Sequence, residues 1–115
     1  GKGGGEVVTE ERAHAVLKGH TGSVECLAWS PSEKGVLVTA STDKSMRFWE
    51  VGEGGGRCVM VVEEAHSTDV NCLSWNAKES HLLVSGGDDG SIKVWDLRSF
   101  KSKASLDAKK KQRGG

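Results

Sequence analysis

The stretch SGGDDGSIKVWD, at residues 85–96, has a counterpart in TASTDKSMRFWE, at residues 39–50. The two are 46 residues apart, and the same offset pairs Trp29 with Trp75 and His20 with His66. No gap is needed in this alignment from residue 20 to residue 51. An internal repeat of this length is typical of solenoids and propellers, in which each repeat is one supersecondary unit.

Each repeat reads as short strands separated by turns. Apolar and polar residues alternate with a period of two, and Gly, Pro, Ser and Asp mark the turns. In the first repeat the predicted strands are Val24–Trp29, Val36–Ala40, Ser45–Val51 and Arg57–Val62, with a loose glycine-rich loop at 52–56. The second repeat shows the same pattern, so the sequence predicts an all-β chain.

The ends of each repeat carry a recognisable pair of dipeptides. The first repeat has Gly19-His20 and Trp49-Glu50, and the second has Ala65-His66 and Trp95-Asp96. These motifs resemble the WD40 family, whose signature is Gly-His and Trp-Asp. The resemblance implies a β-propeller fragment of two four-stranded antiparallel blades. Because about four to eight blades close a propeller, two leave it incomplete. The missing blades would come from a longer parent chain or from other copies.

We expect four segments along the chain. They are a flexible N-terminal segment at 1–12, an outer strand of a preceding blade (Ala13–Leu17) with the first repeat at 13–64, the second repeat at 65–106, and a flexible basic tail at 107–115. The fourth strand of the second repeat falls at 103–108. The basic run Lys109–Arg113 suits nuclear import or a nucleic-acid patch, and the alternative is a solvated loop.

The WD40 resemblance implies a buried hydrogen-bond chain in each blade. Its members are His20, Thr39, Asp43 and Trp49 in the first blade and His66, Ser85, Asp89 and Trp95 in the second. The indole N–H only donates and needs an acceptor when it is buried, which the hydroxyl supplies. A network in which every member is satisfied makes a core rigid.

A hydroxyl, an imidazole and a carboxylate in one network also suggest a hydrolase triad. The set occurs once in each repeat, as a structural support should, whereas one active site needs only one copy. The predicted function is therefore non-catalytic, with the hydrolase as the remote alternative.

The second repeat also resembles one subgroup of the family. Residues 65–75 and 83–101 resemble most the glutamate-rich WD-repeat proteins of ribosome assembly. The second resemblance is to the histone-binding WD40 subunits of chromatin assembly. This resemblance implies a nuclear or nucleolar interaction scaffold for a ribosomal protein or a histone. The alternative is a generic WD40 adaptor in chromatin or in substrate recognition for ubiquitin ligation.

In the family, three positions per blade face the partner. Carried over, they are Ser23, Glu25 and Thr42 in the first blade and Asp69, Asn71 and Asp88 in the second. None is basic and three are acidic, which predicts a surface for a basic protein. The alternative is that all six are ordinary solvated turn residues.

Composition limits the other functional classes. The formal net charge is zero, so no global field favours nucleic acid or a membrane. We expect no apolar membrane span, no direct nucleic-acid binding and no cofactor. Cys26, Cys58 and Cys72 form no C-x-x-C pair and read as reduced intracellular thiols, with Cys26 and Cys72 as small core residues. His14, His20, His66 and the cysteines have no chelating spacing for zinc, and the glycine runs lack the Lys-Ser/Thr of a phosphate loop.

Overall fold

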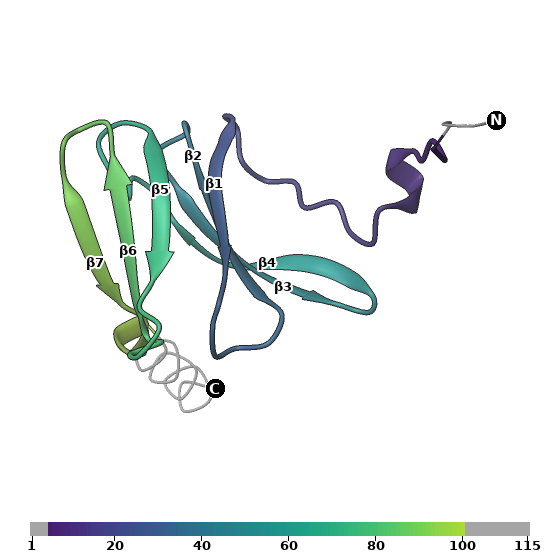
Figure 1. Cartoon of the computed structure of the whole chain (residues 1–115). Coiled ribbons are helices and arrows are strands. Elements are labelled where there is room, and N and C mark those ends of the chain that lie inside the picture. Colours follow the sequence, from purple (N-terminus) through teal and green to yellow (C-terminus); the bar gives the residue numbers. More distant parts are fainter. Residues whose placement is uncertain (1–4, 101–115) are drawn as a thin grey trace, which may run out of the picture.

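Two antiparallel sheets make up the part of the chain that the computed structural model describes, residues 5–100. They lie beside one another (Figure 1). The first contains β1 (Val24–Trp29), β2 (Val36–Ser41), β3 (Met46–Gly52) and β4 (Gly55–Val62), in that order. The second contains β5 (Val70–Trp75), β6 (Leu82–Gly87) and β7 (Ile92–Asp96). A 3-10 turn, η1 (Glu10–Arg12), precedes them. The all-β prediction is confirmed.

The predicted strands and the observed ones differ mainly at the glycine-rich loop. Residues 52–56 do not form a loose loop, because β3 and β4 continue into it until Gly52 pairs with Gly55. Gly55 has a φ of 107°, a conformation that favours glycine and permits this two-residue hairpin turn. The fourth strand predicted for the second repeat lies outside the described residues. Residues 97–100, which lead toward it, are helical.

The segment Ala13–Leu17 forms no strand within the described residues. A strand needs a neighbour to satisfy its N–H and C=O groups, and the strands of a preceding blade are not present there. The segment instead contacts the β3–β4 hairpin, where His14 Nε2 lies 2.5 Å from the Gly52 carbonyl oxygen. That this segment completes a preceding blade stays a prediction, as do the segment boundaries at 12, 64 and 106.

The two sheets repeat one another in register as well as in sequence. Cys26 pairs with Ala40 in the first sheet, and Cys72 pairs with Gly86 at the equivalent place in the second. The first strand of each sheet also has a register shift just before this pair, between residues 24 and 26 in β1 and between residues 70 and 72 in β5. The 46-residue repeat is therefore a repeat of backbone geometry.

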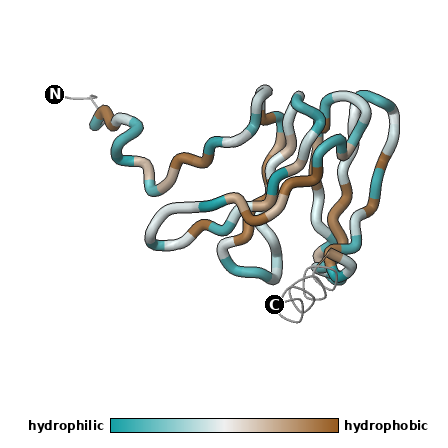
Figure 2. The backbone as a smooth tube through the Cα atoms, turned by 180° about the vertical axis from the view of Figure 1, so that it is seen from behind, coloured by the Kyte–Doolittle hydropathy of each residue, from teal (hydrophilic) through white to brown (hydrophobic). Residues whose placement is uncertain are grey.

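The hydrophobic core lies between the two sheets. Side chains alternate across each strand, so one face of the first sheet meets one face of the second. Most hydrophobic segments in Figure 2 lie along the strands, and the turns are mainly hydrophilic. The buried core residues are Val38, Ala40, Met46, Phe48, Ala65, Val70, Leu73 and Leu83. Full burial of an aliphatic or aromatic side chain stabilises the fold by roughly 1.5–3 kcal/mol, so this cluster holds the sheets together.

Two hydrogen bonds cross from one sheet to the other. The backbone N–H of Leu73 donates to the Cys26 Sγ over 3.3 Å, and the Trp75 indole N–H donates to the Ala28 carbonyl oxygen over 3.4 Å. The backbone N–H of Ala65 also donates to the Lys44 carbonyl oxygen, 2.8 Å away, in the turn between β2 and β3. These bonds set how one sheet is placed against the other.

Candidate functional site: two side-chain networks and an acidic sheet end

The structure brings the four side chains of the first predicted network together. His20 stands before β1, Thr39 lies on β2, Asp43 in the β2–β3 turn and Trp49 on β3. The His20 Nδ1 lies 2.9 Å from Asp43 Oδ2, and its Nε2 lies 2.6 Å from the Thr39 hydroxyl. The Trp49 indole N–H donates to the same hydroxyl over 2.9 Å. The network thus ties β2, β3 and the turn between them to the segment that enters the sheet.

The second network has the same connections. His66 Nδ1 lies 3.2 Å from Asp89 Oδ1, and its Nε2 lies 2.8 Å from the Ser85 hydroxyl. The Trp95 indole N–H donates to that hydroxyl over 2.8 Å. His66 is 1% exposed and Ser85 is fully buried, so this network is sealed from solvent at its centre.

Counting donors in the chain of bonds assigns the histidine tautomer. The ionised carboxylate can only accept, so the proton of a neutral imidazole lies on Nδ1, and the hydroxyl, whose oxygen accepts the indole N–H, donates its own hydrogen to Nε2. Nε2 is then the acceptor nitrogen, and the proton sits on Nδ1, which donates to the carboxylate. Trp, hydroxyl, His and Asp therefore form one directed chain that ends on a negative charge, and each polar group in it has a partner.

The carboxylate that ends each chain is strongly stabilised in its charged form. Burial by itself would raise the pKa of Asp43, but the donors around it outweigh burial and hold that pKa well below its usual range. These donors are the Ser45 hydroxyl, the His20 ring and the backbone N–H groups of Thr21 and Ser45. The pKa of Asp89 is also lowered, mainly by the backbone N–H and the hydroxyl of Ser91 and then by the backbone N–H of Ser67.

Ser45 and Ser91 belong to the networks, and the sequence argument missed them. The Ser45 hydroxyl is 2.5 Å from Asp43 Oδ1, and the Ser91 hydroxyl is 2.7 Å from Asp89 Oδ1. Each also lies close to the histidine Nδ1, at 3.2 Å for Ser45 and 2.9 Å for Ser91. The signal was available, because a serine stands two residues after the aspartate in both repeats, where it can turn back onto the carboxylate.

The hydrolase alternative receives no support from this geometry. Thr39 is 6% exposed and Ser85 is fully buried, so a substrate cannot reach either hydroxyl. Each hydroxyl oxygen also accepts the indole N–H, so the tryptophan ring lies against the hydroxyl in both networks. The networks are therefore suited to holding the sheets in shape.

The six predicted partner-facing residues fall into two groups at one end of the sheets. The backbone N–H of Thr42 donates to the Ser23 carbonyl oxygen over 3.0 Å, and Glu25 is exposed beside them at the start of β1. In the second sheet the backbone N–H of Asp88 donates to the Asp69 carbonyl oxygen over 3.1 Å. The Asn71 side-chain amide in turn donates to the Asp88 carboxylate.

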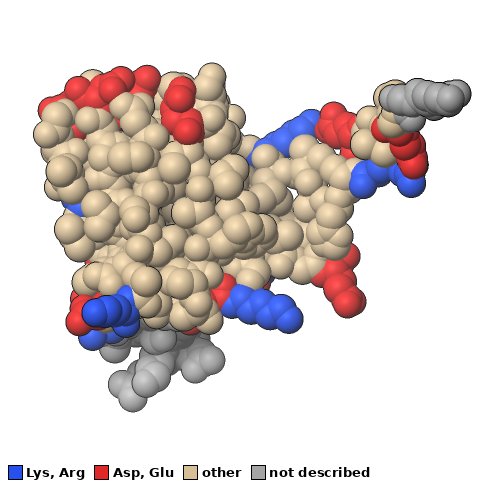
Figure 3. All heavy atoms as spheres, viewed as in Figure 1, with Lys and Arg blue, Asp and Glu red and all other residues tan. Residues whose placement is uncertain are grey.

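This end of the molecule is predominantly acidic. Figure 3 shows acidic side chains along the top edge of the view, where β5 begins and β6 and β7 are joined, while the lysine and arginine side chains in sight lie lower. Asp88 is exposed and Asp69 is half-buried. We call the group formed by Glu25, Asp69, Asn71 and Asp88 the acidic end.

The repeats match a known family. The model of the WD domain, G-beta repeat family matches residues 12–50 and 56–96, which is more than half of the chain. The chain belongs to the WD40 family. Each matched segment ends at the residue after the network tryptophan, so the two sheets are WD40 blades. WD40 propellers are typically non-enzymatic scaffolds for protein partners, which is the coarse function that the family supports.

Individual relatives match only parts of the chain. THO complex subunit 3 of Arabidopsis thaliana is 47% identical over 47 residues, which are 41% of this chain and 14% of that protein. Glutamate-rich WD repeat-containing protein 1 of Dictyostelium discoideum is 49% identical over 35 residues, or 30% of this chain and 7% of that protein. The solved structure of the RRP9 WD40 repeats has a TM-score of 0.63 and 30% identity, covering 72% of this chain and 25% of that one. The chain thus spans a small part of the relatives it matches.

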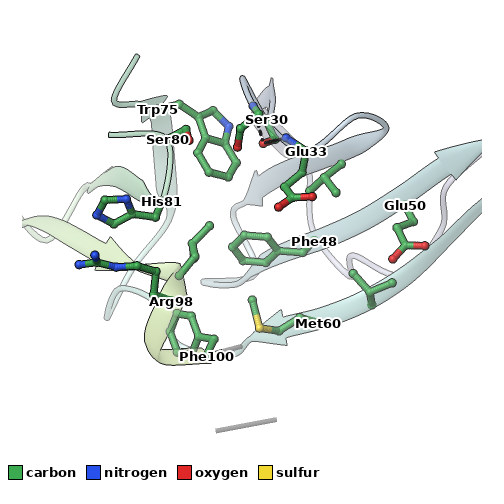
Figure 4. A pocket seen from close by; sticks show the side chains of 14 residues that line it. Ser30, Glu33, Phe48, Glu50, Met60, Trp75, Ser80, His81, Arg98 and Phe100 are labelled. Carbon is green, nitrogen blue, oxygen red and sulfur yellow. Dashed lines mark hydrogen bonds between the residues drawn. The ribbon is translucent and has the colours of Figure 1, made fainter. Parts of the chain in front are cut away.

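A cleft of about 500 Å³ separates the two WD40 blades at the end opposite the acidic end. Phe48, Met60 and Trp75 form an apolar wall, with Glu50 and Arg98 at the rim (Figure 4). The Arg98 guanidinium is already engaged, since its Nη2 donates to Asp96 Oδ2 over 2.9 Å. Both blades contribute to the cleft, so neither repeat alone predicts it, and it follows from the divergence of two twisted sheets.

Other classes of site are limited as follows. Among residues 5–100, no three His, Cys, Asp or Glu side chains are grouped so that they could hold a metal ion. No helix in that range is long and apolar enough to cross a membrane.

The cysteines are unpaired thiols, and Cys26 packs against the core. Cys72 is exposed, which corrects the prediction that it is a core residue, because no neighbouring sheet covers its side of β5 among the described residues.

Proposed function

We propose that this WD40 chain is a non-catalytic scaffold whose acidic end binds a basic protein surface. The observation that carries the proposal is the grouping of Asp69, Asn71 and Asp88 on the second blade, joined by the backbone and side-chain bonds described above. A carboxylate that is exposed yet held in place attracts a cationic partner without first having to be ordered. Lys44 lies in the β2–β3 turn of the first blade, so the negative potential is strongest on the second.

The biological setting of this scaffold is proposed from resemblance. The second repeat is similar to the glutamate-rich WD-repeat proteins, and the match of 49% over 35 residues supports that subgroup without separating it from others. We accordingly propose a nuclear or nucleolar role in ribosome biogenesis or histone binding, with a basic ribosomal protein or a histone as partner.

Charge reversal at the acidic end tests the proposal. Fluorescence anisotropy with a labelled Lys/Arg-rich peptide measures the affinity of the whole chain and of the Asp88→Lys variant. The matched control is Glu53→Lys, which changes the net charge equally at the exposed tip of the β3–β4 hairpin. We expect Asp88→Lys to raise Kd about tenfold, or about 1.4 kcal/mol, and Glu53→Lys to change it less than about twofold.

The same assay distinguishes the proposed partners. Purified core histones and a basic large-subunit ribosomal protein replace the peptide in separate titrations at two salt concentrations. Binding of either that weakens with salt and with Asp88→Lys supports the acidic end as the binding surface. If Asp88→Lys and Glu53→Lys weaken binding equally, the six predicted partner-facing residues are ordinary solvated turn residues. The generic WD40 adaptor function is then favoured over a scaffold for a basic protein.

A further inference from the structure

Two apolar faces of the blade pair are uncovered among the described residues. The first, which we call the β1 face, consists of Val24, Leu27 and Trp29, which are 50%, 57% and 56% exposed. The second, the β7 face, consists of Ile92 and Val94, which are 77% and 62% exposed. Large apolar side chains so exposed on adjacent positions of a sheet mark an interaction surface.

The repeat shows what each face packs against when it is covered. The equivalents of Val24 and Leu27, 46 residues later, are Val70 and Leu73, which are 0% and 9% exposed because they pack against the first blade. The residues of the first blade that are equivalent to Ile92 and Val94 are Met46 and Phe48, which are 0% and 3% exposed in that same interface.

The β1 face and the β7 face are therefore copies of the two halves of the interface inside the chain. The β1 face is identical to its covered counterpart at all three positions, since Trp29 corresponds to Trp75. The β7 face keeps apolar character at both of its positions. An acceptor for a further hydrogen bond is also available on this face. Within the chain the Cys26 Sγ accepts the Leu73 N–H, and Cys72, the equivalent of Cys26, is exposed.

We propose that the β1 face of one copy of this chain docks on the β7 face of a second copy, in the geometry that joins the two blades within one chain. The contact is head-to-tail, because the two faces differ, so a docked pair keeps one free face of each kind for further copies. In this arrangement Trp29 comes beside Val94, as Trp75 comes beside Phe48 within the chain, and the Leu27 N–H donates to Cys72 of the neighbouring copy. About four to eight blades close a propeller, so a closed ring would hold roughly two to four copies.

The two faces can be blocked separately to test this docking. Leu27→Asp with Trp29→Asp blocks the β1 face, and Ile92→Asp with Val94→Asp blocks the β7 face. All four side chains are exposed in the single chain, so the substitutions leave the internal core intact. The near-UV circular dichroism of the remaining tryptophans checks that each variant is folded. The measurement is solution mass by light scattering across a range of protein concentrations.

Head-to-tail docking makes a specific prediction for the mixture of variants. The unmodified chain has the mass of two or more copies, and each blocked variant alone has the mass of one. An equimolar mixture has the mass of two copies, because the variant with a free β7 face binds the variant with a free β1 face. A single-copy mass for the unmodified chain at about 100 µM overturns the proposal, as does a folded blocked variant that still pairs with itself.

Discussion

At the residue scale, the arrangement that defines this chain is an aspartate at a turn that accepts hydrogen bonds from several donors. Asp43 accepts from a histidine ring, a hydroxyl and two backbone N–H groups, and Asp89 does the same in the second blade. One short side chain thus fixes the turn, the histidine tautomer and, through the hydroxyl, the indole. Removing any link leaves buried polar groups without partners, which is where the cost of substitution arises.

His66→Ala tests the cost of breaking the second network. The substitution leaves the buried Ser85 hydroxyl with one partner fewer and the Asp89 carboxylate without its ring donor, so we expect the free energy of unfolding to fall by about 2–4 kcal/mol. Urea denaturation followed by tryptophan fluorescence measures it. The control is His81→Ala, which removes a part-exposed histidine 3.8 Å from Glu79 and should cost less than about 0.5 kcal/mol. Equal losses for both variants would mean that the network is not stabilising.

Acid should destabilise the fold through the same carboxylates. The pKa of Asp43 is lower in the folded chain than in the unfolded chain, where it is about 3.9. Its contribution is therefore fully present above that value and is lost as the pH falls below it. We expect the unfolding free energy of the unmodified chain to fall from about pH 5 to about pH 2. Asp43→Asn should be less stable than the unmodified chain at pH 7, and the difference should shrink steadily as the pH falls from about 5 to about 2. A difference that is independent of pH would contradict the assigned cause.

At the element scale, the hairpin turns of the first blade require particular glycines. Gly35 has a φ of 82°, and an added Cβ would lie 2.7 Å from the Val51 carbonyl oxygen. Its own carbonyl oxygen accepts the Val51 N–H over 2.8 Å, so the backbone cannot move away without losing that bond. The position thus joins the β1–β2 connection to β3 through backbone atoms alone.

Gly35→Ala should therefore destabilise the chain by about 1–3 kcal/mol, because it adds both an unfavourable φ and a close contact with a carbonyl. Thermal unfolding followed by circular dichroism measures the change in stability. Gly54→Ala is the matched control, since its Cβ would meet nothing within 4 Å and its φ is not positive. A control that is as destabilised as Gly35→Ala would show that alanine is disfavoured at these turns for another reason.

At the scale of the whole molecule, stability depends on one interface between two blades. The same leucine occurs at both equivalent positions, but Leu73 is 9% exposed inside that interface and Leu27 is 57% exposed outside it. The identical side chain thus has two environments, which separates the effect of burial from the effect of residue type.

Leu73→Ala should lower the unfolding free energy by about 2–5 kcal/mol, because it opens a cavity between the blades. Leu27→Ala should lower it by less than about 1 kcal/mol at high dilution, where each copy is alone. Urea denaturation at two protein concentrations measures both. A Leu27→Ala cost that grows with protein concentration supports docking of the β1 face, and a large cost at high dilution would contradict the exposure of Leu27.

The amino-acid sequence by itself determined the repeat and the seven strands of the two sheets, and its resemblance to the WD40 family identified the histidine, hydroxyl, aspartate and tryptophan of each network. These are local or periodic properties, since turn residues, the two-residue alternation and the 46-residue spacing can all be read without knowing what packs where. Ser45 and Ser91 were not predicted, because a hydroxyl that bonds a carboxylate two residues back is independent of the strand alternation.

Tertiary structure alone decided which copy of each repeated residue is buried. Leu27 and Leu73, like Cys26 and Cys72, occupy equivalent places in β1 and β5, and only a neighbouring sheet buries Leu73 and packs Cys26 against the core. The cleft between the blades and the contact of His14 with the β3–β4 hairpin also join residues far apart in the chain. Burial is a property of the pair of surfaces in contact, so identical local sequences cannot encode the difference.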